Sequence, residues 1–181
     1  MGDRALNRPA VFLDRDGVLN EAVLREGKPH PPDDVTSMTI VAGAREALER
    51  LAAAGFVRIV VTNQPDVGRG TQSRETVEAI HAELQRRLPL DAVYVCYHAG
   101  HEACACRKPQ PGLLFQAARD HGIDLARSFL IGDRWKDVAA AAAAGVRPIF
   151  IDYGYAEPKP AEPHDAARSV EEAAELILLR K

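Results

Sequence analysis

Short apolar runs typical of buried strands alternate along this chain with segments that have the periodicity of amphipathic helices. Residues 57–61 are the clearest strand, because four of the five are β-branched, which suits a strand that is covered on both faces. Further strand-like runs lie at residues 10–14, 91–96, 128–131 and 148–152, and helix-like segments lie at 43–54, 73–87, 111–121, 135–144 and 170–180. This alternation predicts an α/β fold, with a mostly parallel sheet, helices on both faces and one domain over residues 1–181.

Polar residues follow most of the predicted strands at their carboxyl ends. Asp14 ends the first strand, Thr62 and Asn63 follow the second, Cys96 ends the third, and Asp133 comes shortly after the fourth. Because the carboxyl ends of parallel strands share one edge of the sheet, we expect these side chains to converge there. This edge is the predicted functional site.

The first of these ends carries two carboxylates two positions apart, Asp14 and Asp16, followed by Gly17. Side chains of a strand alternate between its faces, so Asp14 and Asp16 are expected to project together while Arg15 points away. The pair suggests a nucleophile and a general acid beside a metal ion. The alternative for Asp16 is that it caps the turn at Gly17.

Composition excludes several classes of function. Net charge is −3 and the aromatic fraction is 6%, which argues against nucleic acid as a partner. The longest aliphatic run, around residues 138–144, is too short to cross a membrane, and residues 1–9 show no secretory signal. We therefore expect a cytoplasmic protein, monomeric, with no membrane or nucleic-acid partner.

The three cysteines lie within one short segment, which argues against a disulfide framework. Together with one histidine they offer four soft ligands, Cys96, His98, Cys104 and Cys106, a set that matches a closed structural zinc site. A zinc-binding loop is therefore expected at about residues 96–106. The alternative is a group of reduced cysteines without metal, and His101 is a spare candidate ligand.

Four motifs follow one another in order along the chain: Phe12-Leu13-Asp14-Arg15-Asp16-Gly17, Val61-Thr62-Asn63-Gln64, Cys106-Arg107-Lys108-Pro109 and Ile131-Gly132-Asp133-Arg134-Trp135-Lys136-Asp137. With them the chain resembles the haloacid dehalogenase (HAD) superfamily, and within it the heptose bisphosphate and histidinol-phosphate phosphatases. Any one of them is a weak signal, whereas their joint order and spacing is specific. The resemblance implies a Rossmann-like sheet without a separate cap domain, and it covers about residues 11–153.

The resemblance also implies roles for individual residues. Asp14 would be the nucleophile that becomes phosphorylated, and Asp16 would act as general acid and base. Mg²⁺ would be held by Asp14, Asp133 and the backbone carbonyl of Asp16, with Asp137 supporting the site from one helical turn further on. Thr62 and Lys108 would contact the transferred phosphoryl group. Taken singly, Asp133 could instead be a helix N-cap, Thr62 a strand end and Lys108 a solvated surface residue.

Matching by position implies the substrate contacts of a small phosphorylated sugar. They are Ala22, Val23, Leu24, Arg25, Thr62, Asn63, Gln64, Pro65, Arg107, Lys108 and Arg134. Arg25, Arg107 and Arg134 would suit a second anionic group, which favours a bisphosphate. The segment 26–33 has no functional signature.

The expected reaction is Mg²⁺-dependent removal of the 7-phosphate from D-glycero-D-manno-heptose 1,7-bisphosphate, through an aspartyl-phosphate. Three alternatives stay open at this point: a histidinol-phosphate phosphatase, a polynucleotide 3′-phosphatase and a non-catalytic, zinc-stabilised binding protein.

Overall fold

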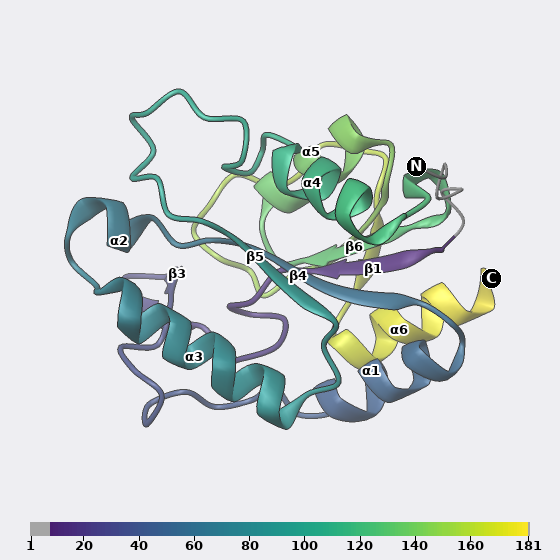
Figure 1. The fold of residues 1–181 in the computed structure, drawn as a ribbon, viewed down its shortest axis with the longest axis horizontal. Helices are drawn as coiled ribbons and strands as arrows, with labels where there is room; N and C mark the ends of the chain where they lie inside the picture. The colour runs from purple at the N-terminus through teal and green to yellow at the C-terminus, as the bar shows by residue number, and fades with distance from the viewer. Residues whose placement is uncertain (1–7, 181) are drawn as a thin grey trace.

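A computed structural model describes residues 8–180 and contains a six-stranded parallel sheet at its centre (Figure 1). The strand order is β5-β4-β1-β6-β7-β8. The strands are β1 (Ala10–Leu13), β4 (Val57–Asn63), β5 (Ala92–Cys96), β6 (Phe129–Gly132), β7 (Arg147–Ile151) and β8 (Asp165–Ala167). The predicted α/β fold with a parallel sheet is confirmed.

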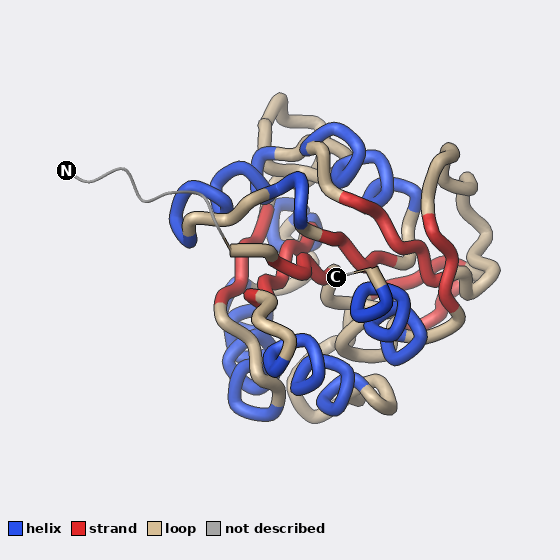
Figure 2. The backbone as a smooth tube through the Cα atoms, turned by 90° about the vertical axis from the view of Figure 1, so that its right-hand side faces the viewer, coloured by secondary structure: helices blue, strands red, loops and turns tan. Residues whose placement is uncertain are grey.

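Helices cover both faces of this sheet. Figure 1 shows α4 (Gly112–His121) and α5 (Trp135–Ala144) above it, and α1 (Ala44–Ala53), α3 (Arg74–Arg87) and α6 (Val170–Leu179) below it. Figure 2 gives the same layers from the side, with the twisted strands enclosed between helices. The predicted helices are therefore present, with ends that differ by a residue or so.

The central strand β1 explains why the sequence reads as continuously apolar there. Val11 and Leu13 belong to the core between the sheet and the helices α1, α3 and α6, whereas Ala10 and Phe12 belong to the core between the sheet and the helices α4 and α5. All four side chains are fully buried. A strand that is covered on both faces needs an apolar residue at every position, which is the pattern that residues 10–13 have.

Five short elements differ from the sequence-based expectation, and two of them form a hairpin. Segment 26–33, expected as a loop, contributes to a two-stranded hairpin of β2 (Val23–Arg25) and β3 (Lys28–His30). Its turn has Glu26 at φ 52 and Gly27 at φ 75. A glutamate in the left-handed region is uncommon, so the turn gives no clear sequence signal.

The other three unexpected elements are the helix α2 (Pro65–Arg69), the edge strand β8 and a 3-10 turn at Leu125–Arg127. All of these are shorter than the windows in which periodicity can be recognised. The segment that joins β1 to α1 contains the hairpin β2–β3 and no larger insertion, in agreement with the expected absence of a cap domain.

The terminal helix α6 packs on its own domain, against α1, β6, β7 and β8. Val170, Ala174 and Ile177 are fully buried on that face. Within residues 8–180 the structure has no helix with the length and apolar character needed to cross a bilayer. The expectation about a secretory signal concerns residues 1–9, most of which lie outside the described residues.

Candidate active site

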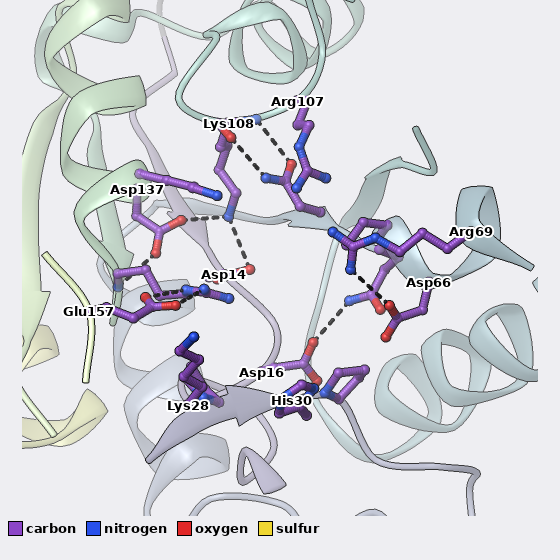
Figure 3. A pocket seen from close by; sticks show the side chains of 17 residues that line it. Asp14, Asp16, Lys28, His30, Asp66, Arg69, Arg107, Lys108, Asp137 and Glu157 are labelled. Carbon is purple, nitrogen blue, oxygen red and sulfur yellow. Dashed lines mark hydrogen bonds and ion pairs between the residues drawn. The ribbon is translucent and has the colours of Figure 1, made fainter. Parts of the chain in front are cut away.

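A cavity of about 200 Å³ opens at the carboxyl edge of the parallel strands (Figure 3). Asp14 follows β1, Asn63 ends β4, and Asp137 lies in the first turn of α5 after β6. Lys108 reaches the same space from the segment between β5 and α4. The side chains that the sequence scatters over four motifs therefore meet at this edge, as parallel topology requires.

Lys108 and two carboxylates form a buried ionic cluster in this cavity. The Lys108 ammonium lies 3.0 Å from Asp14 Oδ1 and 2.6 Å from Asp137 Oδ1, and it donates to the carbonyl of Val61 across 2.8 Å. Burial alone would lower the pKa of Lys108, but the charges of Asp137 and Asp14 outweigh it and raise this pKa. Lys108 is therefore a fixed cation with all three donors in use, and a solvated surface position is excluded.

Asp14 carries an unfavourable charge despite this lysine. Burial, followed by the charge of Asp137, raises the pKa of Asp14 to about 6. Its Oδ1 accepts from Lys108 and from the backbone N–H of Arg15 across 2.8 Å. A further positive charge near Asp14 would lower this pKa and stabilise the ionised carboxylate.

Asp133 completes a group of three buried acids with Asp14 and Asp137, whose ligand oxygens all lie within 4.8 Å of one another. Burial and then the charge of Asp14 raise the pKa of Asp133 well above its usual value. Oδ2 of Asp133 accepts from the Tyr155 hydroxyl across 2.9 Å, whereas its buried Oδ1 has no partner within residues 8–180.

Hard carboxylate oxygens with excess negative charge suit Mg²⁺. A carboxylate oxygen that is buried without a hydrogen-bond donor costs free energy, and a bound cation would remove that cost. The unpartnered oxygen of Asp133 is therefore available as a metal ligand. The residues present therefore fit a divalent cation between Asp14 and Asp133.

Two glycines make this crowding of carboxylates possible. A Cβ on Gly17, whose φ is +86, would lie 1.9 Å from Asp133 Oδ2. A Cβ on Gly132 would lie 2.3 Å from the Asp137 side chain. Only residues without a side chain allow the backbone to approach the acids this closely.

Asp16 is held in a network of its own. Its carboxylate accepts from Arg15 at both oxygens, from Asn20 across 2.9 Å and from Gln64 across 2.9 Å. Burial raises the pKa of Asp16, but the Arg15 charge and these hydrogen bonds outweigh it, and the pKa is lowered overall. Asp16 is therefore a carboxylate at neutral pH in the free protein.

The expectation that Arg15 points away from its neighbouring acid is wrong. β1 ends at Leu13, so the alternation of strand side chains stops before Arg15. The guanidinium is fully buried and folds back onto Asp16, and its Nη1 lies 3.1 Å from Nε2 of His81 on α3. Burial and the Arg15 charge lower the pKa of His81 to about 3, so its ring is neutral and Nε2 accepts this hydrogen bond.

The segment of residues 62–64 at the end of β4 holds other residues of the site in place through hydrogen bonds. Asn63 accepts from the backbone N–H of Lys108 and donates to its carbonyl, both across 3.0 Å. Gln64 donates to Thr62 Oγ1 as well as to Asp16, and it accepts from Arg15. Thr62 is buried, and Asn63, Gln64 and Pro65 line the cavity.

The predicted zinc ligands lie together. Cys96 Sγ is 3.0 Å from Cys106 Sγ and 3.9 Å from Cys104 Sγ, and His98 Nδ1 is 3.2 Å from Cys106 Sγ. Zinc–sulfur bonds of about 2.3 Å give tetrahedral edges of about 3.8 Å, which the Cys96–Cys104 separation matches, while the other two separations are shorter. Burial and the neighbouring thiols raise the pKa of Cys96 to about 12, a cost that a bound cation removes. The four residues thus fit zinc, while His101 is exposed and is not part of the group.

The predicted substrate contacts separate into two groups. Arg107 and Arg134 line the cavity beside Lys108, but Glu157 forms an ion pair with the Arg134 guanidinium. Residues 22–25 do not line it: Leu24 is largely exposed, and Arg25 pairs with Asp33 on the surface.

Several residues of the site gave no sequence signal. Lys28 and His30 of β3 lie across the cavity from Arg107 and Lys108, in the segment 26–33 that has no functional signature in the sequence (Figure 3). Tyr155 and Glu157 come from the proline-rich loop after β7 and reach Asp133 and Arg134. Short loop segments have no periodicity, so only their three-dimensional placement identifies these four residues.

Comparisons with known proteins agree with this arrangement. Residues 105–176 match the model of a family described as HAD-hydrolase-like. The chain is 35% identical to a D-glycero-β-D-manno-heptose-1,7-bisphosphate 7-phosphatase from Bordetella bronchiseptica, over 80% of each chain. It is 38% identical to an enzyme of the same name from Helicobacter pylori, over 76% of this chain and 79% of that one.

A solved structure of the D,D-heptose 1,7-bisphosphate phosphatase from B. bronchiseptica, in complex with magnesium and phosphate, superimposes with a TM-score of 0.83 at 30% identity, covering 96% of this chain and 99% of that one. A putative HAD-like phosphatase from Mesorhizobium loti gives 0.76 at 29% identity, covering 98% and 89%. The sequence match spans most of both chains, and the fold and the order of the motifs agree with it. The chain belongs to the HAD-like hydrolases, in the branch that contains the heptose 1,7-bisphosphate 7-phosphatases.

Proposed function

We propose that this protein is a Mg²⁺-dependent phosphatase that removes the 7-phosphate of D-glycero-D-manno-heptose 1,7-bisphosphate. The observation that carries the proposal is the arrangement around Asp14. Its buried carboxylate pairs with Lys108 and belongs to the group of three acids with Asp133 and Asp137, and it lines a cavity that Asp16 also lines. The heptose bisphosphate phosphatases named above supply the substrate class.

In this proposal Asp14 attacks the phosphorus atom, and the bond from phosphorus to the sugar oxygen breaks. The Lys108 ammonium, fixed by Asp137 and Val61, neutralises charge on the transferred group. A Mg²⁺ ion held by Asp14 and Asp133 would supply the additional positive charge that brings the anionic phosphate and the carboxylates together.

Asp16 would donate its proton to the departing sugar oxygen. Its lowered pKa in the free protein means that this proton has to be acquired when substrate binds. A phosphate dianion beside Asp16 raises the pKa of the carboxyl through like-charge repulsion, which favours proton uptake. The resulting carboxylate would then accept a proton from the water that hydrolyses the phosphorylated Asp14.

We also infer that the cluster of Cys96, His98, Cys104 and Cys106 holds a structural zinc ion. The cluster is a compact group of one imidazole and three free thiols, and Arg107 and Lys108 follow it directly. Free thiols of this kind favour a reducing compartment, which supports the cytoplasm. Packing of α6 on its own domain supports a single-domain monomer.

The test is a comparison of phosphate esters under the same conditions. Protein is incubated with Mg²⁺ and heptose 1,7-bisphosphate, histidinol phosphate or a 3′-phosphorylated oligonucleotide, and phosphate release is measured, with Asp14→Asn as the inactive control. We expect kcat/KM for the heptose bisphosphate to exceed the others by orders of magnitude, with release from C7 identified by ³¹P NMR. A preference for histidinol phosphate would refute the proposed substrate. No turnover of any ester would favour a binding protein.

A further inference from the structure

Three consecutive residues of the loop after β7 connect the fourth motif with the hairpin β2–β3 beside the active-site cavity. The Tyr155 hydroxyl donates to Asp133 Oδ2 across 2.9 Å. The Ala156 N–H donates to the carbonyl of Gly27, in the turn of the hairpin β2–β3, across 3.0 Å. Glu157 accepts from Arg134 Nε across 2.8 Å. This segment, residues 155–157, therefore connects Asp133 and Arg134 of the fourth motif with the turn of the hairpin β2–β3.

The contact with Asp133 determines which carboxylate oxygen is available. Asp133 is 2% exposed, so neither oxygen is satisfied by bulk water. Oδ2 accepts from Tyr155, while Oδ1 is buried and has no partner within residues 8–180, and Asp133 forms a group of possible metal ligands with Asp14 and Asp137. One hydrogen bond thus limits the rotation of the carboxylate and leaves Oδ1 as the oxygen without a donor.

The backbone at Gly17 preserves this contact. A Cβ there would lie 1.9 Å from Asp133 Oδ2 and 3.1 Å from the Tyr155 hydroxyl oxygen. The hydroxyl and the carboxylate therefore meet in a space that only a glycine leaves open. The contact is part of a closely packed junction between two loops, and the surrounding backbone holds both partners.

We propose that Tyr155 is a positioning residue for Asp133, whose hydroxyl orients the carboxylate so that Oδ1 is presented to the divalent cation. The inference rests on the proposed metal-dependent function. A phenol is suited to this role because it supplies one hydrogen bond without adding positive charge that would compete with the cation. Groups that hydrogen-bond a ligating carboxylate set its direction and strengthen metal binding.

The experiment measures binding of Mn²⁺, used as a probe for the Mg²⁺ site, to zinc-loaded protein by electron paramagnetic resonance. We expect Tyr155→Phe to raise the Kd for Mn²⁺ by about tenfold or more, since loss of such a partner costs 10- to 100-fold in known metal sites. Tyr153→Phe is the matched control. Its ring lies 5.6 Å from that of Tyr155, but within the described residues its hydroxyl makes no hydrogen bond to Asp133. Its Kd is expected to stay within about twofold of the unaltered protein.

Steady-state kinetics give a second measurement that separates positioning from a general structural role. Tyr155→Phe should raise the Mg²⁺ concentration for half-maximal activity, while kcat at saturating Mg²⁺ returns close to that of the unaltered protein. The melting temperature without added Mn²⁺ and its increase on adding Mn²⁺ show that folded protein is being measured.

The outcomes are distinguishable. If the unaltered protein binds Mn²⁺ and Tyr155→Phe binds it equally well, the role of Tyr155 is refuted while the proposed function stands. If the unaltered protein binds no Mn²⁺, both are refuted. An equal loss of affinity in Tyr153→Phe would also overturn the inference, because it would show a general effect of the loop.

Discussion

Lys108 donates through Nζ to Oδ1 of Asp14 across 3.0 Å, although the two residues belong to the third and first motifs of the chain. Both side chains are buried, and the same ammonium contacts Asp137. Asn63 holds the backbone of Lys108 from β4. The nucleophile of the proposed reaction is therefore paired with a cation whose position is set from three directions, so stability and activity depend on the same contacts.

Substitution of Lys108 by methionine should impair both properties. Loss of one partner from a buried ion pair leaves uncompensated carboxylates, and we expect the free energy of unfolding at pH 7 to fall by about 3 kcal/mol or more. We expect kcat to fall by at least about 100-fold, because a preorganised charge is lost at the phosphoryl group. Urea unfolding and phosphate release measure the two effects. Lys159→Met, which removes an exposed lysine paired with Asp152, is the control and should leave both nearly unchanged.

Asp14→Asn should inactivate the protein and yet stabilise it at high pH when Mg²⁺ is absent. The pKa of Asp14 is raised to about 6 in the folded state, so folding favours its protonated form. This contribution to stability is complete below about pH 4 and is lost as the pH rises through about 6. At pH 8 the uncharged variant should therefore be more stable than the unaltered protein by about 3 kcal/mol, and the difference should vanish near pH 4.

This comparison is made by urea unfolding in Mg²⁺-free buffer without a chelator, so that bound zinc is kept. A stability difference that does not change with pH would contradict the raised pKa of Asp14. Addition of Mg²⁺ at pH 8 should stabilise the unaltered protein more than Asp14→Asn, because the variant lacks one carboxylate ligand.

Loss of the proposed zinc site should affect KM more than kcat. The backbone carbonyl of His98 accepts from Arg107 Nη1 across 3.2 Å, so the zinc-binding loop positions this arginine. Lys108 is held separately by Asn63. His98→Ala is expected to lose its zinc and to raise KM by about tenfold, with a smaller change in kcat. His101→Ala should retain one zinc per chain by elemental analysis. Zinc-free protein that is stable and fully active would refute the site.

The buried contact between His81 and Arg15 predicts that substitution of His81 lowers the catalytic rate, because Arg15 also binds Asp16. His81→Leu removes the acceptor 3.1 Å from Arg15 Nη1 and leaves that buried donor unpaired. We expect kcat to fall by about tenfold or more as Arg15 and Asp16 shift, because small displacements of reacting groups are costly. His81→Gln supplies an acceptor again and should restore most of the rate. Equal rates in all three proteins would show that Arg15 is held without His81.

The position of the hairpin β2–β3 predicts which cation meets the second phosphate. Lys28 lines the cavity, whereas Arg25 on the neighbouring strand pairs with Asp33 outside it. Lys28→Ala should therefore raise KM for the bisphosphate by about 3- to 10-fold, with an effect that weakens at high salt. Arg25→Ala should leave KM unchanged. The reverse result would support the sequence-based assignment of Arg25 as a substrate contact.

The sequence was sufficient to predict the parallel sheet, its two helical layers and the group of motifs at one edge. Each of these depends on local features, such as the apolar residues at every position of β1 and the polar residues that follow Leu13, Val61 and Gly132. It also predicted that Cys96, His98, Cys104 and Cys106 belong together, because their spacing within one segment limits how far apart they can lie. Their metal content stays a prediction.

Arg15 marks the point where local reasoning fails. Strand alternation predicts its direction only while the strand continues, and β1 ends at Leu13. Its partner His81 comes from α3, where a lone histidine on an apolar helix face has no distinguishing pattern. Arg134 is a similar case, since its ion pair with Glu157 could not be inferred from the motif that contains it.

The sequence by itself determined the fold class and the chemistry available at the sheet edge, because apolar periodicity and motif order are properties of short segments. Only the tertiary structure decided which loops complete that edge: Tyr155 on Asp133, Glu157 on Arg134, and β3 opposite Lys108. These contacts join residues far apart in the chain through segments that have no periodicity. Their positions follow from the packing of the whole domain, which no local pattern encodes.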